Sequence, residues 1–164
     1  MSARIAVYAG SFDPATLGHL DIIERASALF ENVIVAIGRH PTKHPTFTFE
    51  ERLELLRSIT SHLPNVTVDS FDGLLINYCL EKGAKVIVRG LRVTTDFEYE
   101  LQIAHANADL GPQVDTIFLP TRTRHGFVSA SLVREIASHG GDVTRYAPPV
   151  VCEALKKKFA AKQA

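Results

Sequence analysis

The residues of this chain that are best suited to chemistry lie in three short polar stretches. These are "YAGSFDPATLGHLD" (residues 8–21), "VIVRGLR" (86–92) and "HGFVSASLVRE" (125–135). Each combines glycine with hydroxyl, imidazole or guanidinium groups, which bind phosphate oxygens in proteins. The common nucleotide signatures GxxxxGK[ST] and GxGxxG are absent from the sequence, so neither a P-loop nor an ordinary dinucleotide site is favoured. We therefore expect a phosphate site of another design.

The first stretch predicts a phosphate donor at the start of a helix. Gly18 has no side chain to block a phosphate, and His19 would lie in the first turn, where free backbone amides favour anions. Ser11, just past the preceding strand, adds a hydroxyl. The alternative is a packing glycine beside a surface histidine. Asp13 is interpreted as structural, because an Asp-Pro pair fits a turn whose carboxylate caps local amides.

Lys43 lies in the proline-rich segment "RHPTKHPTF" after the second expected strand. Its side chain could reach over a bound phosphate as a mobile lid, or it could be a solvated loop lysine. His40 and His44 flank it, but the segment has no acidic residue, and we do not expect these histidines to bind a metal ion.

Arg89 and Arg92 follow an apolar strand, on either side of Gly90, which would let the backbone turn tightly. Two guanidinium groups at a strand end predict a bidentate phosphate clamp. The alternative is pairing with nearby carboxylates, which are those of Asp96, Glu98 and Glu100. For Glu100, the two interpretations are a contact with the sugar or base of a ligand and a contact with a neighbouring arginine.

Ser129 and Ser131 stand at the start of a predicted helix in the third stretch. Their hydroxyls and the nearby amides could hold a second set of phosphates. A plain N-cap would need only one of the two serines.

The elements that must position these residues alternate along the chain. Strands are predicted over 4–8, 33–37, 66–68, 86–88 and 116–119 from short β-branched runs. Helices are predicted over 20–30, 49–59, 74–82, 97–109, 132–138 and 150–160. Two helices are expected to open with a capping box, Thr48 with Glu51 and Thr95 with Glu98.

This alternation predicts an α/β fold, a doubly wound five-stranded parallel sheet of the Rossmann-like type with helices on both faces. Ligands of such sheets bind beyond the carboxyl ends of the strands, where the strand order reverses. The three polar stretches each follow a strand, so we expect them to meet at one edge of the sheet.

Length and composition indicate one soluble domain over residues 1–164. Eighteen basic residues balance eighteen acidic ones, which argues against a partner such as nucleic acid or an anionic membrane. No apolar run suits a signal peptide or a membrane span, and we expect a cytoplasmic protein. Cys79 and Cys152 lie in apolar, helix-like surroundings and are interpreted as buried free thiols.

Taken together, the motifs resemble those of the bacterial phosphopantetheine adenylyltransferases. The resemblance covers essentially the whole chain and rests on "YAGSFDPATLGHLDII", "HPTKHPTFTFEER", "VIVRGLRVTTDFEYELQIAHAN" and "FVSASLVREIASHGGDVTRYAPP". T-x-G-H alone marks only the wider nucleotidyltransferase superfamily, whereas "RGLR…DFEYE" with the lysine loop is more particular. The resemblance implies transfer of AMP from ATP to 4′-phosphopantetheine, giving dephospho-CoA and pyrophosphate, the penultimate step of coenzyme A synthesis.

The same resemblance implies roles for individual residues. It makes His19, Lys43 and Arg92 catalytic. It assigns phosphopantetheine to Ser11, Lys43, Leu75 and Arg89. It assigns ATP to Ser11, Phe12, His19, Gly90, Leu91, Arg92, Glu100, His125, Gly126, Phe127, Val128, Ser129, Ala130 and Ser131. Mg²⁺ is expected to be bound mainly through phosphates, with no side-chain ligands.

Two positions depart from the pattern of many relatives, since Ser11 replaces a threonine and Ala130 replaces the middle serine of an "SSS" run. The resemblance also implies a homohexamer and feedback inhibition by coenzyme A. Two other functions stay open. One is an adenylyltransferase that uses nicotinamide mononucleotide, and the other is a nucleotide-sensing domain without catalysis.

Overall fold

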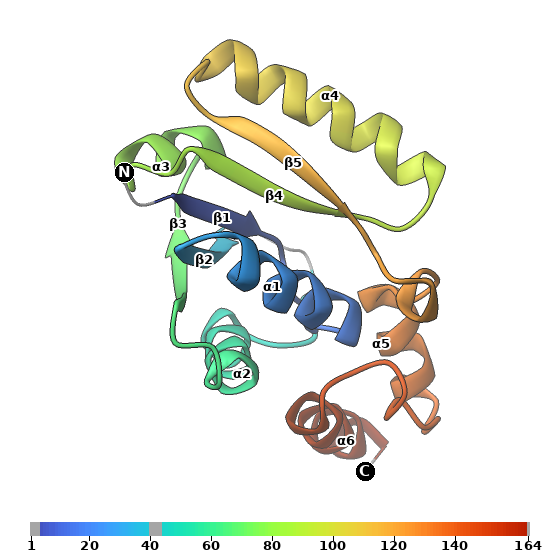
Figure 1. Ribbon diagram of the computed structural model, residues 1–164. Coiled ribbons are helices and arrows are strands. Elements are labelled where there is room, and N and C mark those ends of the chain that lie inside the picture. Colours follow the sequence, from blue (N-terminus) through green and yellow to red (C-terminus); the bar gives the residue numbers. More distant parts are fainter. Residues whose placement is uncertain (1–3, 40–43, 164) are drawn as a thin grey trace.

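Five parallel strands form one sheet in the order β3-β2-β1-β4-β5 (Figure 1). The computed structural model describes residues 4–39 and 44–163. The strands are β1 (Ile5–Ala9), β2 (Asn32–Gly38), β3 (Val66–Phe71), β4 (Val86–Leu91) and β5 (Asp115–Pro120). All five lie where the sequence predicts a strand, and the predicted α/β class with a five-stranded parallel sheet is confirmed.

The strand order reverses beside β1. The chain passes from β1 to β2 and β3 on one side, and then returns to place β4 and β5 on the other side. β1 therefore pairs with both β2 and β4, with Tyr8 opposite Val35 on one side and Val88 on the other. The crevice that such a reversal leaves beyond the strand ends lies between β1 and β4.

In the described ranges the helices are α1 (Leu17–Leu29), α2 (Phe49–Thr60), α3 (Leu75–Glu81), α4 (Thr94–Leu110), α5 (Ala130–Ser138) and α6 (Pro149–Gln163), with a short 3₁₀ turn, η1 (Thr123–His125), before α5. Figure 1 shows α1 and α2 on one side of the sheet and α3 and α4 on the other. No helix in the described part of the chain is both long and apolar enough to cross a membrane.

The sheet has a hydrophobic core on each face, and successive side chains of β1 point alternately into the two cores. Ala6 and Tyr8 belong to the cluster that the sheet forms with α1, α2, α5 and α6, whereas Val7 and Ala9 belong to the cluster with α3. Both cysteines are buried free thiols, as the sequence predicts: Cys79 is fully buried in α3, and the Cys152 thiol donates to the Val143 and Ala147 carbonyls.

Helix α4 is unlike the other long helices, because none of its 17 residues is buried. It lies over β4 and β5, and several large apolar side chains on it and on its flanks remain exposed, namely Val93, Phe97, Tyr99, Ile103, Leu110 and, on β5, Ile117. A helix of a monomeric protein usually buries one apolar face. This surface, defined by those six residues, is called the α4 face below.

Three local expectations are wrong. Helix α4 begins at Thr94 after Val93, which makes no side-chain cap, so the box expected for Thr95 and Glu98 does not form. Asp13 does cap amides, but these lie in a distant segment rather than in its own turn. Gly90 does not turn the chain, because β4 continues to Leu91 and its last residues pair with β5. The box of Thr48 with Glu51 is confirmed.

Candidate active site

A cleft of about 420 Å³ opens at the carboxyl ends of β1 and β4, where the strand order reverses. Segments far apart in the sequence meet there: the loop after β1, the start of α1, the end of β4 and the start of α5. Of the residues predicted for the site, those that line the cleft are Ser11, Phe12, His19, Arg89, Gly90, Arg92, Glu100, Val128, Ser129, Ala130 and Ser131. The expectation that the three polar stretches meet at one edge is confirmed.

The loop between β1 and α1 is fixed from several sides. The Asp13 carboxylate accepts hydrogen bonds from the backbone amides of Thr46 and Phe47, at 2.9 Å each. Arg134 from α5 donates to the Asp13 carbonyl, and Arg52 from α2 donates to the Ser11 carbonyl at 2.9 Å. These hydrogen bonds connect the loop to α2 and α5. The Ser11 side chain remains exposed on the cleft.

His19 takes part in a capping box that the sequence analysis missed. The Thr16 hydroxyl accepts from the His19 backbone amide, and the Thr16 amide donates to Nδ1 of the His19 ring at 3.0 Å. Because Nδ1 accepts this hydrogen bond, the proton of the neutral ring resides on Nε2. Local backbone geometry therefore makes His19 a donor through Nε2.

The surroundings of His19 keep its ring neutral. Burial lowers its pKa from 6.5 to about 4, and the positive charges of Arg92 and Arg89 add to the effect. The ring packs edge-on against Phe12, with centroids 5.1 Å apart. Phe12 adopts a φ of 46°, a conformation that residues other than glycine rarely adopt and that is often found at functional sites.

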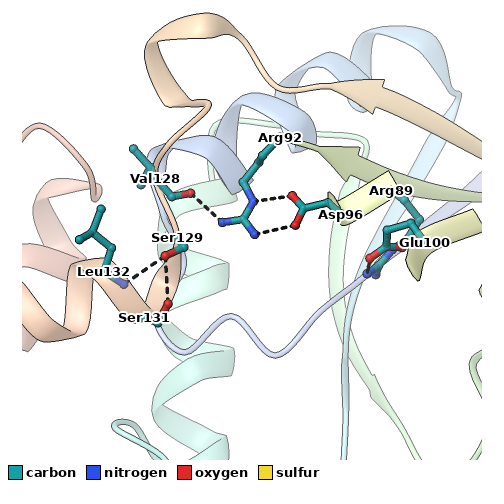
Figure 2. Close-up of polar contacts among 8 residues, drawn as sticks. All are labelled: Arg89, Arg92, Asp96, Glu100, Val128, Ser129, Ser131 and Leu132. Carbon is teal, nitrogen blue, oxygen red and sulfur yellow. Dashed lines mark hydrogen bonds and ion pairs between the residues drawn. The ribbon is translucent and has the colours of Figure 1, made fainter. Parts of the chain in front are cut away.

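Arg89 is held in place by a carboxylate and a carbonyl. Its Nε and Nη2 donate to the two Glu100 oxygens at 2.6 Å each, and its Nη1 donates to the Ala9 carbonyl at 2.7 Å (Figure 2 shows the carboxylate pair). Of the two interpretations of Glu100, the structure shows the contact with an arginine. Arg89 thus links β4 to the end of β1 and to α4.

Arg92 bridges two walls of the cleft. Its guanidinium group makes a two-pronged contact with Asp96, at 3.1 and 3.3 Å, and also donates to the Val128 carbonyl at 3.3 Å (Figure 2). Both arginines therefore carry the carboxylate pairing that the sequence left open as the alternative to a phosphate clamp. Both also line the cleft.

Ser129 and Ser131 form the entrance to α5. Ser129 is the N-cap, with its hydroxyl accepting from the Leu132 amide at 3.1 Å, and the two serine hydroxyls lie 3.0 Å apart (Figure 2). The second serine is not needed for the cap. Hydroxyls and free amides at a helix start form a site suited to anions.

Other predicted residues lie away from the cleft lining. Leu75 lines a neighbouring pocket of about 160 Å³ that also includes Arg89 and Glu100. Leu91, His125, Gly126 and Phe127 line neither pocket. Lys43 lies outside the described residues, as does His40.

His125 is buried, and its Nε2 accepts from Arg124 at 3.0 Å. Its Nδ1 is the one buried side-chain nitrogen or oxygen within residues 4–39 and 44–163 that has no hydrogen-bond partner. Burial lowers the pKa of this ring. His125 therefore resembles a packed residue of the segment before α5 rather than a group that faces the cleft.

Several further residues of the lining were not predicted, among them the polar residues Tyr8, Thr16, Thr121 and Arg134. Arg134 stands three residues after Ser131, so the helical period could have placed it on the same face. Tyr8 is the residue of β1 that faces α1 near the strand's carboxyl end. Its position in the strand was the only available signal.

The donor set of the cleft suits anions better than metal ions. Within the described ranges, no group of three or more His, Cys, Asp or Glu side chains is placed to hold a metal ion. The two lining carboxylates, those of Asp96 and Glu100, are each paired with an arginine. Neutral histidine, arginines, serines and a helix start can together hold phosphate groups and stabilise negative charge on them.

Comparisons with known proteins agree with this chemistry. The cytidylyltransferase-like family model matches residues 7–136. The phosphopantetheine adenylyltransferase of Synechococcus sp. (strain RCC307) is 56% identical over 94% of this chain and 93% of its own length. That of Caldanaerobacter subterraneus is 50% identical over 95% of this chain and 98% of its own length.

A solved structure shows the same fold at much lower identity. The Plasmodium falciparum nicotinic acid mononucleotide adenylyltransferase, complexed with NaAD, superposes with a TM-score of 0.65 at 18% identity, over 94% of this chain and 95% of that one. Half or more of the residues are shared with the first two proteins over almost their whole length. The chain therefore belongs to the cytidylyltransferase-like family and, within it, to the phosphopantetheine adenylyltransferases.

Proposed function

We propose that this protein transfers the adenylyl group of MgATP to 4′-phosphopantetheine and releases dephospho-CoA and pyrophosphate. The observation that carries the proposal is the neutral His19, a donor through Nε2, in a cleft that it shares with Arg89 and Arg92. The high identity to phosphopantetheine adenylyltransferases along the whole chain supports this acceptor over nicotinamide mononucleotide.

The reaction needs positioning and charge stabilisation rather than a base. The phosphate of phosphopantetheine is already an anion, so it can attack the α-phosphorus of ATP in line without losing a proton. His19 would donate from Nε2 to an oxygen of the α-phosphate as negative charge develops there. A neutral ring suits this role, because it can donate throughout the physiological pH range.

The two walls of the cleft fit the two substrates. Ser11 and Arg89, together with Lys43, would hold the phosphate of phosphopantetheine, and Leu75 in the neighbouring pocket would contact its arm. Gly90 and Arg92 at the end of β4, and the 128–131 segment at the start of α5, would hold ATP. Glu100 would act on the ligands through Arg89, whose guanidinium group it orients.

Mg²⁺ would enter with ATP, held mainly by phosphate oxygens. The carboxylates that line the cleft are already paired with arginines, so they are poor candidates for metal ligands. Mg²⁺ commonly keeps several water molecules and binds through substrate phosphates in such sites.

Assembly, regulation and location are also part of the proposal. The exposed α4 face supports a homo-oligomer, and a hexamer is proposed from the family resemblance. Coenzyme A contains the adenylyl and phosphopantetheine parts of dephospho-CoA, the proposed product. This likeness supports feedback inhibition by coenzyme A in the same cleft. A cytoplasmic location suits a chain whose substrates are soluble phosphates.

The test is pyrophosphate release from ATP and Mg²⁺, with 4′-phosphopantetheine added or withheld and with nicotinamide mononucleotide as a parallel acceptor. We expect release that depends on phosphopantetheine. Faster release with nicotinamide mononucleotide would contradict the proposed acceptor. ATP binding without release from either acceptor would instead indicate a nucleotide-sensing domain.

A further inference from the structure

The floor of the cleft contains a tyrosine hydroxyl that the proposed mechanism does not use. Tyr8 on β1 is only 6% exposed, and what remains exposed lines the cleft. Its ring packs edge-on against Phe12, with centroids 5.5 Å apart, and lies 6.5 Å from the His19 ring. Within the described part of the chain, its hydroxyl makes no hydrogen bond.

The Tyr8 hydroxyl is open to the cleft. It is not among the fully buried side-chain atoms that lack a hydrogen bond, so water can reach it until a ligand takes that place. Phenylalanine would give the same ring packing without a donor. Tyr78 differs, because its hydroxyl donates to the Asp69 carboxylate at 2.6 Å. The Tyr8 hydroxyl has no acceptor in the described part of the chain and can therefore donate to a ligand in the cleft.

The neighbouring backbone leaves this hydroxyl uncovered. Gly90 lies beside it on β4, and a Cβ atom built there would be 3.8 Å from the Tyr8 oxygen and 3.2 Å from Ile22 Cγ1. Any side chain at position 90 would thus crowd the space in front of the hydroxyl. Tyr8 and Gly90 line the same cleft as His19 and Arg89.

The charges around Tyr8 favour an anionic ligand. Arg89 and Arg92 are close enough to act on its hydroxyl electrostatically, together with Glu100. Burial raises the pKa of Tyr8 to about 12, so the group stays protonated and can only gain by donating to an acceptor.

We infer that the Tyr8 hydroxyl binds substrate directly. It donates a hydrogen bond to the phosphoryl group that is transferred from one substrate to the other in the cleft lined by His19 and Arg89. This inference rests on the proposed function and adds a binding residue to it. The donor would act together with Nε2 of His19. A fixed neutral donor is suited to stabilise charge that develops on a phosphate.

The first test compares two matched substitutions, Tyr8→Phe and Tyr78→Phe, by kinetics and thermal unfolding. For Tyr8→Phe we expect a ten- to hundredfold loss of kcat/KM, carried mainly by kcat, with a melting temperature no lower than that of the unmodified protein. For Tyr78→Phe we expect the reverse, a lower melting temperature with kinetics retained, because its hydroxyl has a structural partner. A kcat/KM for Tyr8→Phe within twofold of the unmodified protein would overturn the inference.

The second test detects the contact without catalysis. The chain has four tyrosines, so protein labelled with 3-fluorotyrosine should give four fluorine resonances, and the one absent from Tyr8→Phe identifies Tyr8. We expect that resonance to shift on saturation with MgATP, while the Tyr78 resonance stays. No shift of the Tyr8 resonance under conditions where calorimetry shows ATP bound would sink the idea. This readout does not depend on the acceptor, so it separates failure of the inference from failure of the proposed reaction.

Discussion

The two walls of the cleft are built differently. On the β1 wall, formed by residues 10–19, backbone amides fix the orienting groups: Thr16 sets the His19 ring, and the Asp13 carboxylate is held by two distant amides. On the β4 wall, formed by residues 89–100, both cations are paired with carboxylates of α4, a helix without a buried residue.

This difference indicates that the β1 wall is prepared for an anion before any ligand binds. His19 Nε2 has its proton, and no carboxylate of the described residues accepts a hydrogen bond from the ring. On the β4 wall, a phosphate must share or replace Asp96 as the partner of Arg92. We therefore expect the β1 wall to be the rigid part of the site and the β4 wall to be the part that rearranges when a ligand binds.

The most damaging change should be loss of the donor on the β1 wall. His19→Ala is expected to lower kcat by about 10²–10³-fold, or about 3–4 kcal/mol of transition-state stabilisation, because the proposed donor to the α-phosphate is lost. ATP affinity from calorimetry should change little. His62→Ala is the control, since that histidine lies on the surface beside Glu24. An equal loss of affinity and rate in His19→Ala would contradict the assigned role.

The anchor of the β1 wall should matter for stability. Asp13→Ala leaves the amides of Thr46 and Phe47 without their acceptor, and we expect the free energy of unfolding to fall by about 2–3 kcal/mol in urea titrations. Asp142→Ala is the matched control, because its carboxylate also accepts two hydrogen bonds, but both come from the exposed Thr144 nearby. A similar loss for both variants would mean that the anchor of the β1 loop has no special importance.

The two arginines of the β4 wall are expected to contribute differently to the stability of the protein. Arg89→Met leaves the Glu100 carboxylate, 12% exposed, without its cation, and we expect a loss of about 2 kcal/mol in the free energy of unfolding. Arg92→Met removes a more exposed pair, and the expected loss is about 0–1 kcal/mol. Differential scanning calorimetry of both variants checks this order. The reverse order would show that Arg92, rather than Arg89, holds the wall together.

A similarly small effect is expected in the dependence of stability on pH. The pKa of His19 is lowered to about 4 in the folded protein, whereas an unfolded histidine titrates near 6.5. Between these values the unfolded chain binds more protons, so protonation favours unfolding and stability rises with pH across this window. Through His19, the free energy of unfolding at pH 6 should be about 1 kcal/mol lower than at pH 8.

The pH effect is measured as a difference between two proteins. Urea titrations at pH 6 and pH 8 should show a larger loss for the unmodified protein than for His19→Gln, which has no titrating ring. Other titrating groups are common to both proteins and cancel in the comparison. Equal losses would show that His19 titrates normally and that its ring is not held neutral by the cleft.

Sequence patterns predicted the elements of this fold because the strands are short β-branched runs between clear helical patterns. The parallel arrangement of the sheet followed from the alternation of strands and helices, and so did the meeting of three polar stretches at one edge. The box at Thr48 could be predicted because both of its partners are local and of the usual types. The box at Thr16 could not, because its return partner is a histidine ring rather than a glutamate.

The unpredicted parts depend on contacts between distant segments. The donors to Asp13 lie 33 residues or more away in sequence, and Glu100 reaches Arg89 only through the packing of α4 on the sheet. Likewise, Gly90 stays in β4 because β5 supplies ladder partners for the end of that strand. No local pattern contains this information, so the arginines could be placed at the site but their partners could not be chosen.

The buried cysteines make this protein convenient for site-specific labelling. Burial raises the pKa of the Cys79 thiol to about 11 and raises that of Cys152 as well. Maleimide reagents react with exposed thiolates, so both native thiols should stay unmodified in the folded protein. A cysteine placed at an exposed position such as Leu29, which is 62% exposed, could then carry a single fluorophore without removal of either native thiol.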